Sequence, residues 1–379
     1  MAAVHAGFLP DRSATSQRGA AASRVTSLDS VRGLAALTVV VCHYLILLAG
    51  TPFAEHVSPW LAYPPLSLFK TAYGAVVLFF VLSGYVLALS LRSESNTPSW
   101  SGFAVRRFCR IWPPYAATIL ISFAIGHAAL QADSVLPPAW QVNAWHLADI
   151  SLDALVGQIS MAVSQISLDV PGWSLVYELR ITLAFPLLLF LLRRAPATTV
   201  AASFFLHIAS LFGPPWLAAL IPDTATFIVF FAAGAWLALN GARLVDLRRA
   251  TASTKIMLAA IALLLLSVPG SHPWAGIVAG LGAVLLIAVV TTSPEADQFL
   301  SVPWCAFLGR VSYSLYLTHV VVLMGLGTVL GAWLPVWLIL LVAAPVVAIV
   351  AWIGYRWVEL PSMRLGRFAA RRLAASAAS

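Results

Sequence analysis

A chain of 379 residues in which 61% are hydrophobic and only 9% are charged has too few polar side chains to cover a water-soluble globular protein. Its mean hydropathy of +0.91 is typical of a protein that crosses a membrane several times. The formal net charge of +8 does not indicate a nucleic-acid-binding protein, because the basic residues fall between apolar runs instead of gathering on one surface.

The N-terminal segment, residues 1–27, is rich in Ala and Ser and contains no apolar core of the length that a secretory signal requires. We expect it to be a flexible cytoplasmic tail. The first apolar run, 31–49, is close to the ~20 residues that an α-helix needs to cross a bilayer. We therefore expect the first membrane span there.

Nine further apolar runs follow along the chain, at 73–91, 111–130, 173–192, 199–212, 224–239, 256–268, 274–292, 311–330 and 336–357. Together they predict an all-α integral membrane protein, a bundle of about ten transmembrane helices. The runs 199–212 and 256–268 are shorter than a full crossing, which leaves the count open by one or two. No internal repeat is visible.

The connections between these runs alternate in charge, which predicts the orientation of the chain. The connection 92–110 contains four arginines, whereas 131–172 contains Asp133, Asp149, Asp153 and Asp169 and no Lys or Arg. Because basic loops stay on the cytoplasmic side, 131–172 is expected outside and both termini inside. The expected organisation is a tail (1–27), a transmembrane domain (28–361) and a basic cytoplasmic tail (362–379).

The first span carries Arg32 and His43 in an otherwise apolar sequence. On a helix their eleven-residue separation places both side chains within ~20° of one face and ~16 Å apart along the axis. An ionisable side chain inside a membrane is a functional-site hypothesis. The alternative is structural: His43 hydrogen-bonds a neighbouring helix and Arg32 anchors the interface. Asp29 requires no role beyond a helix N-cap.

Two further spans begin with charged residues that have two readings each. Arg107 and Arg110 are three apart, so on a helical turn they share a face and can grip a phosphate group, or they only set the topology.

Glu178 lies about one turn into its span from the external side, where a carboxylate needs a partner or a cavity. Arg180 is on a different face and is a poor partner for it. Pairing of Glu178 with another helix is the structural alternative.

The last two spans carry the remaining polar side chains. Ser312, Tyr316 and His319 fall on one helical stripe, which indicates either a functional face or interhelical hydrogen bonding. Arg356 and Glu359 are three apart, which predicts an ion pair along the helix. The three cysteines are far apart in the sequence and have no metal or redox spacing, so no metal site is expected.

Five sequence motifs occur in a fixed order over about 27–361. They are Arg32 and His43 with ten residues between them, Phe79-Phe80-Val81-Leu82-Ser83-Gly84-Tyr85, Arg107-x-x-Arg110 before Ile111-Trp112-Pro113, Trp173-Ser174-Leu175-x-x-Glu178, and Ser312 to His319. This order resembles the membrane acyltransferase-3 family, bacterial integral-membrane O-acyltransferases of surface glycans and of some small molecules. One departure is the sequence Leu179-Arg180 after Glu178, where the family more often has an aromatic pair, and it bears on the acceptor.

The resemblance implies a reaction and a set of roles. An acyl group, expected to be acetyl, would pass from cytoplasmic acyl-CoA to a hydroxyl of a cell-surface or exported glycan, across a bacterial cytoplasmic (inner) membrane. Arg32, Arg107 and Arg110 would hold the phosphates of CoA, and His43 would deprotonate the acceptor or relay the acyl group. Glu178 would line an acceptor cavity rimmed by the loop 131–172.

The resemblance also places Ser312, Tyr316 and His319 as supporting residues around that site. Some family members carry an additional extracytoplasmic hydrolase-like domain, and this chain is expected to complete the transfer alone or with a separate partner. The alternative functions are an acyltransferase of a small-molecule natural product, a transporter that uses the same buried groups, and an assembly scaffold. The missing repeat disfavours a transporter, although the two short runs leave that option open.

Overall fold

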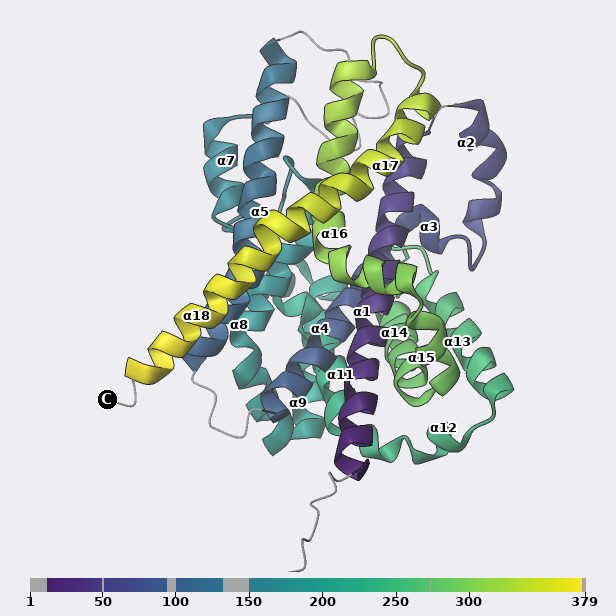
Figure 1. The fold of residues 1–379 in the computed structure, drawn as a ribbon, viewed down its shortest axis with the longest axis vertical. Coiled ribbons are helices and arrows are strands. Elements are labelled where there is room, and N and C mark those ends of the chain that lie inside the picture. The colour runs from purple at the N-terminus through teal and green to yellow at the C-terminus, as the bar shows by residue number, and fades with distance from the viewer. Residues whose placement is uncertain (1–11, 50, 94–99, 132–149, 273, 377–379) are drawn as a thin grey trace, which may run out of the picture.

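The computed structural model describes residues 12–49, 51–93, 100–131, 150–272 and 274–376, and every regular element in these ranges is a helix (Figure 1). The all-α prediction is therefore confirmed for the described part of the chain. Seven helical stretches are long and apolar enough to cross a membrane. They are α1 (Arg12–Leu47), α4 (Tyr73–Ser93), α5 (Trp100–Gln131), α8 (Trp173–Arg194), α14 (Ala275–Thr292), α16 (Pro303–Leu330) and the continuous stretch of α17 (Val336–Gly354), η5 (Tyr355–Glu359) and α18 (Leu360–Ser376).

Three shorter apolar helices coincide with the remaining apolar runs. They are α9 (Pro196–Phe212), α11 (Ala225–Leu239) and α13 (Ala252–Leu266). Each apolar run of the sequence thus contains a helix, but among the described residues seven stretches have the length of a full crossing. Ten spans remain a prediction.

Short helices occupy the connections, and their charges differ between the two ends of the bundle. They are α2 (Pro52–Val57), η1 (Trp60–Ala62), α3 (Leu68–Thr71), α7 (Leu152–Ile159), η3 (Val170–Gly172), α10 (Pro215–Leu220), η4 (Gly241–Arg243), α12 (Val245–Arg249) and α15 (Pro294–Leu300). Figure 1 shows α2 and α7 at one end, whereas α12, the start of α1 and the end of α18 lie toward the other. Asp153 lies in the first turn of α7, and Arg248 and Arg249 lie in the last turn of α12. Which end faces the cytoplasm stays a prediction.

Helices extend into three segments that we described as tails or as a connection between spans. α1 begins at Arg12, within the predicted tail 1–27, and α18 continues to Ser376 through the predicted tail 362–379. α5 begins at Trp100, which places the arginines of the connection 92–110 on the helix itself. The apolar runs identify the membrane-crossing parts of these helices but not their polar extensions, because a polar helical turn carries no hydropathy signal.

Close helix crossings at glycines hold the bundle together. α1 packs along α16 and α4 along α11. At the first crossing, a Cβ atom on Gly33 would lie 2.5 Å from the backbone nitrogen of Gly309. At the second, a Cβ atom on Gly84 would lie 2.2 Å from the carbonyl oxygen of Phe231. Small residues allow such backbone contact between membrane helices, and the first crossing holds Arg32 beside α16.

We expect Gly33→Ala to lower the melting temperature of the purified protein, because the new methyl group must push α1 away from α16. Overpacking of this kind costs about 1–3 kcal/mol. Gly241→Ala is the matched control, since a Cβ atom there meets no atom within 4 Å. Thermal unfolding of both variants in detergent measures the difference, and equal melting temperatures would show that the crossing tolerates a wider spacing.

Candidate functional site

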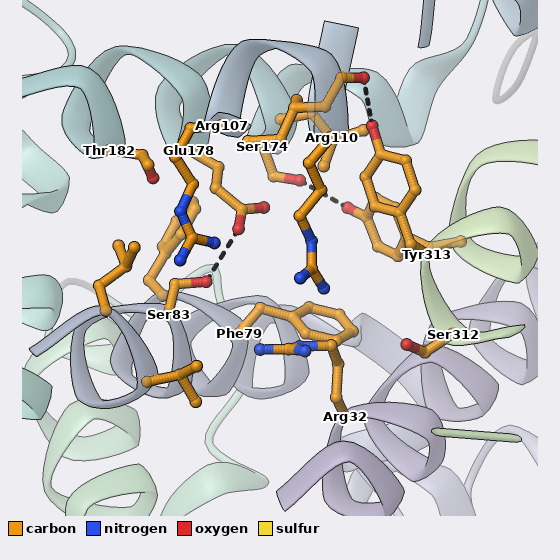
Figure 2. Close-up of a pocket in the computed structure, with 16 residues that line it drawn as sticks. Arg32, Phe79, Ser83, Arg107, Arg110, Ser174, Glu178, Thr182, Ser312 and Tyr313 are labelled. Carbon is orange, nitrogen blue, oxygen red and sulfur yellow. Dashed lines mark hydrogen bonds between the residues drawn. The ribbon is translucent and has the colours of Figure 1, made fainter. Parts of the chain in front are cut away.

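A buried pocket lies where α1, α4, α5, α8 and α16 come together (Figure 2). The cavity has a volume of about 770 Å³ including its open mouth. Its polar lining consists of Arg32, Ser83, Arg107, Arg110, Ser174, Glu178, Thr182, Ser312, Tyr313 and Tyr316. The structure therefore brings together six of the residues singled out from the sequence, although they come from four different helices.

Three arginines dominate the charge of this pocket. Figure 2 shows Arg107 and Arg110 reaching from α5 and Arg32 from α1 toward one shared space. Arg32 also pairs with Asp29, whose carboxylate lies 3.2 Å away and is 47% exposed at the pocket's edge. Glu178 is the only acidic residue in the lining, so the formal charge of the lining is three positive against one negative, or +2. A buried excess of guanidinium groups suits an anionic ligand such as a phosphate.

Two prolines remove hydrogen bonds from the helix that carries Arg107 and Arg110, but the helix continues past them. Pro113 and Pro114 lie inside α5, and each lacks the amide hydrogen that would bond to the carbonyl four residues earlier. The carbonyl groups of Cys109 and Arg110 consequently lose their helical donors beside the pocket. At the next residue, Tyr313 of α16 donates to the carbonyl of Ile111 at 2.6 Å, which ties α16 to this part of α5.

Glu178 lies in the same pocket as the three arginines, and its role in lining an acceptor cavity stays a prediction. Its Oε1 accepts a hydrogen bond from Ser83 at 2.8 Å, and Figure 2 shows its carboxylate beside Arg107. The first turn of α8 is itself inside the bundle, since Pro171 and Gly172 just before it are buried. One turn into α8 is therefore surrounded by other helices, and the depth of Glu178 in the membrane stays a prediction.

Tyr316 connects the pocket to the histidines. Its hydroxyl donates to the carbonyl of Pro171 at 3.0 Å and lies 2.8 Å from the hydroxyl of Ser174. Its ring is 5.4 Å from that of Phe79 in the pocket and 6.2 Å from that of His319. Ser312, Tyr316 and His319 are all buried, as one stripe of α16.

His43 and His319 form a hydrogen-bonded pair on the other side of Tyr316, and neither lines the arginine pocket. Nε2 of His319 lies 3.2 Å from Nδ1 of His43. Nδ1 of His319 lies 3.1 Å from the carbonyl of Leu315, and Nδ1 of His43 lies 2.9 Å from the carbonyl of Val39. A carbonyl only accepts, so both Nδ1 atoms carry the proton when the rings are neutral. His319 then accepts from His43 through Nε2, and the unprotonated nitrogen of His43 is Nε2.

Asp169, at the end of the connection 131–172, is fully buried within the protein. Asp133 and Asp149 lie outside the described residues, and Asp153 is exposed at the start of α7. Neither carboxylate oxygen of Asp169 has a hydrogen-bond partner among the described residues. Burial raises the pKa of this carboxyl well above its usual range, because the charged form is poorly solvated there.

Two other charged residues have structural partners. Arg180 donates to the carbonyls of Met161 and Ala162 at 2.7 and 2.8 Å, and so holds the turn before α8, where Met161 has a left-handed φ of 55°. Glu359 is buried and accepts from Ser314 at 2.8 Å instead of pairing with Arg356, so that expected ion pair was wrong. The physical reason is the π-helix at Tyr355–Glu359, whose wider turn removes the i, i+3 alignment.

Sequence reasoning did not assign a role to Ser83, Ser174 or Tyr313. All three stand in motifs that define the family resemblance, and each is a hydroxyl inside an apolar run. A hydroxyl in such a run must find a partner within the protein, and that signal alone marks them as candidates. Their partners, Glu178, Tyr316 and Ile111, were not deducible from spacing.

A bundle of apolar helices around a positively charged pocket, with a histidine pair beside it, defines a membrane protein that can bind an anion next to a candidate base. Residues 25–356 match the model of the acyltransferase-3 family, described as an acyltransferase domain. The chain belongs to this family.

The comparison with curated proteins finds a partial relative. Acyltransferase MdmB of Streptomyces mycarofaciens is 31% identical over 182 residues, which are 46% of this chain and 41% of the relative. The chain thus spans less than half the length of this relative. No solved structure matches the chain.

We expect Asp169→Asn to raise the melting temperature at pH 8 and to have little effect at pH 4. The raised pKa means that the folded protein keeps the proton that the unfolded chain releases above about pH 4. Wild-type stability therefore falls as the pH rises above that value, and the neutral amide removes this loss. Thermal unfolding across this pH range measures it, with Asp153→Asn as the exposed control. A lower melting temperature at pH 8 would instead show that the charged carboxylate stabilises the fold.

Proposed function

We propose that the protein is a membrane O-acyltransferase that moves an acyl group, expected to be acetyl, from cytoplasmic acyl-CoA to a hydroxyl of a cell-surface or exported glycan. The observation that carries the proposal is the convergence of Arg32, Arg107 and Arg110 on one pocket that adjoins the His43–His319 pair. Membership of the acyltransferase-3 family supports it. The basic residues that end α12 support the proposal that this end of the bundle, with the start of α1, faces the cytoplasm, as the reaction requires.

In this proposal the arginines bind the donor. Guanidinium groups hold phosphate oxygens bidentately and stay charged at all physiological pH values. With the phosphates at Arg107 and Arg110, the pantetheine arm extends along α4 and α16 toward Tyr316, whose ring borders both the pocket and His319. The thioester carbonyl then lies next to the histidine pair.

His43 is the proposed general base. Its unprotonated Nε2 takes the proton of the acceptor hydroxyl while the oxygen attacks the thioester carbonyl. The carbon–sulfur bond breaks, and the CoA sulfur leaves and recovers the proton from His43. His319 is a positioning residue, because its Nε2 accepts from Nδ1 of His43 and thereby keeps the proton off Nε2 of His43. Ser312 and Tyr316 support the wall between the two groups.

The acceptor could be a glycan or a small-molecule natural product, and the residues after Glu178 bear on this choice. Leu179 is buried and Arg180 is bound to the carbonyls of Met161 and Ala162, so neither lines the pocket. The replacement of the family's usual aromatic pair therefore leaves the arginine pocket unchanged. A screen of glycan and small-molecule hydroxyl acceptors, read by mass spectrometry, distinguishes the two classes.

The central experiment is the release of free CoA from acetyl-CoA by the purified protein in detergent, with and without acceptors. We expect His43→Ala to lower turnover by the ~10²–10⁴-fold that loss of a general base causes, while CoA binding is retained. The double variant Arg107→Ala with Arg110→Ala should instead weaken CoA binding.

His127→Ala is the control for these variants, because His127 is exposed on α5 outside the pocket. A His43→Ala protein with near-normal turnover would contradict the role of His43. A wild-type protein that neither binds CoA nor turns over any acyl-CoA would contradict the donor assignment, and a transporter would then be tested by uptake into proteoliposomes.

Glu178 is the second proposed catalytic residue, and its placement beside Arg107 sharpens the test. Glu178→Gln keeps the size and the hydrogen bond to Ser83 but removes a negative charge from an anion pocket. We expect unchanged or tighter CoA binding, because the carboxylate repels the donor phosphates. We also expect a lower kcat, because the carboxylate is needed for the transfer step alone.

Titration of CoA binding and initial rates on the same preparations separate these effects, with Ser83→Ala as the variant that removes only the hydrogen bond. Full activity in the folded fraction of Glu178→Gln, together with a lower melting temperature, would assign Glu178 to structure alone.

A further inference from the structure

A second cavity adjoins the arginine pocket at the end where α5 begins. It lies between α4, α5 and α18 and has a volume of about 590 Å³ including its mouth. Its lining contains four arginines, Arg106, Arg107, Arg110 and Arg367, and no acidic residue. Arg107 and Arg110 line both cavities, so the two spaces share one wall of guanidinium groups.

The position of α18 over this cavity is set by close backbone packing. A Cβ atom on Gly366 would lie 2.7 Å from Cβ of Cys109 and 3.3 Å from Cα of Arg106. Ser362, Gly366 and Ala370 are the buried face of α18, one turn apart each. Figure 1 shows α18 crossing α5 as the continuation of α17. Arg367 follows the contact glycine directly, so its backbone has little freedom to move away from α5.

Arg367 lies on the exposed side of the cavity, where a charged ligand from the cytoplasm would enter. The residue itself is exposed, whereas Phe103, on the opposite wall, is 2% exposed. The guanidinium carbon of Arg107 is 5.6 Å from the centre of the Phe103 ring, a cation–π distance. Phe103 therefore holds Arg107 in place and is too buried to stack on a ligand.

We infer that Arg367 is a further donor-binding residue, and that the cavity between α4, α5 and α18 binds the phosphorylated nucleotide end of the donor. The inference rests on the proposed function. It divides the donor between the two cavities: phosphates on the four-arginine side, and pantetheine and the acyl group on the side of Tyr316. Arg367 lies beyond residue 356, where the family match ends, so this contact comes from a helix outside the matched residues.

The chemistry of the ligand matches this cavity. CoA carries a diphosphate and a phosphate monoester, and the monoester alone holds about −1.5 to −2 charge at neutral pH. Each phosphate can accept paired hydrogen bonds from a guanidinium group. Arg107, Arg110 and Arg367 in one lining therefore suit a nucleotide with several phosphates better than a single anion.

Anionic lipid headgroups are the competing ligand for an arginine on this helix. α18 also exposes Arg364, Arg371 and Arg372, which do not line the cavity. Basic helices at the cytoplasmic surface attract such lipids. Arg364 is one turn before Arg367 on the same helix, so it provides a matched control for surface charge alone.

The test is CoA binding by the full-length protein in nanodiscs of neutral lipid, followed by calorimetric titration of wild type, Arg367→Ala, Arg367→Lys and Arg364→Ala. We expect Arg367→Ala to raise the Kd for CoA about tenfold, the effect of losing one hydrogen-bonded charge pair. Arg367→Lys should recover part of this loss, and Arg364→Ala should bind as wild type does. In the acyl-CoA assay the change should appear in KM and not in kcat.

Pantetheine, which lacks phosphates, supplies the second arm of the test, because its binding should not distinguish wild type from Arg367→Ala. Equal CoA affinity of these two proteins would overturn the inference while leaving the proposed function standing. An equal loss for Arg364→Ala would overturn it in favour of general surface charge. A changed response to anionic lipid with unchanged CoA affinity would assign Arg367 to headgroups. Absence of CoA binding by the wild type would overturn the proposed function and this inference together.

Discussion

The high cost of placing a guanidinium group among apolar helices is the constraint on which this structure depends. An arginine in such a setting requires a counter-charge, a cavity or a ligand. Here three arginines share one pocket with a single carboxylate, and Arg32 alone has an ion-pair partner within 4.0 Å among the described residues. The glycine crossing of α1 and α16 brings Arg32 into reach of the other two. The pocket therefore carries an excess of positive charge that an anionic substrate can offset.

Residues far apart in the chain meet at this site because of two features of α16. Tyr316 forms the wall between the arginine pocket and the histidines, and it is held by Ser174 and the carbonyl of Pro171. His319 then contacts His43 across 276 positions of sequence. The hydrogen bonds of the pair determine which nitrogens carry a proton. Two carbonyl groups and one imidazole nitrogen accept from the two Nδ1–H groups, and the Nδ1–H of His43 is shared between two acceptors. A base with a defined free nitrogen follows from backbone carbonyls and does not require an acidic partner.

Hydropathy predicted where helices lie, but it did not predict how deep their side chains are. All ten apolar runs contain helices, and the stripe of Ser312, Tyr316 and His319 is buried as its period indicates. The burial of the start of α8 was not predictable, because a position near a helix start is exposed only if the helix starts at the surface. The partner of Glu359 was predicted wrongly because the π-turn depends on tertiary packing, and the spacing of residues in the sequence does not indicate it. The His43–His319 contact is long-range, and a single sequence contains no spacing rule for it.

The π-turn between α17 and α18 sets the rotation of α18 about its own axis. A π-turn amounts to one additional residue within a helix, and one residue corresponds to about 100° of rotation. Glu359, at the end of this turn, is anchored to Ser314 of α16, so the rotational phase of α18 is set relative to the helix that carries Tyr316 and His319. A relative with one residue fewer at 355–359 would present a different face of α18 to α5 and would direct another side chain at the position of Arg367. The rotation of α18 about its axis, and not only the identity of its residues, then decides which charged side chain lies at the entrance of the site.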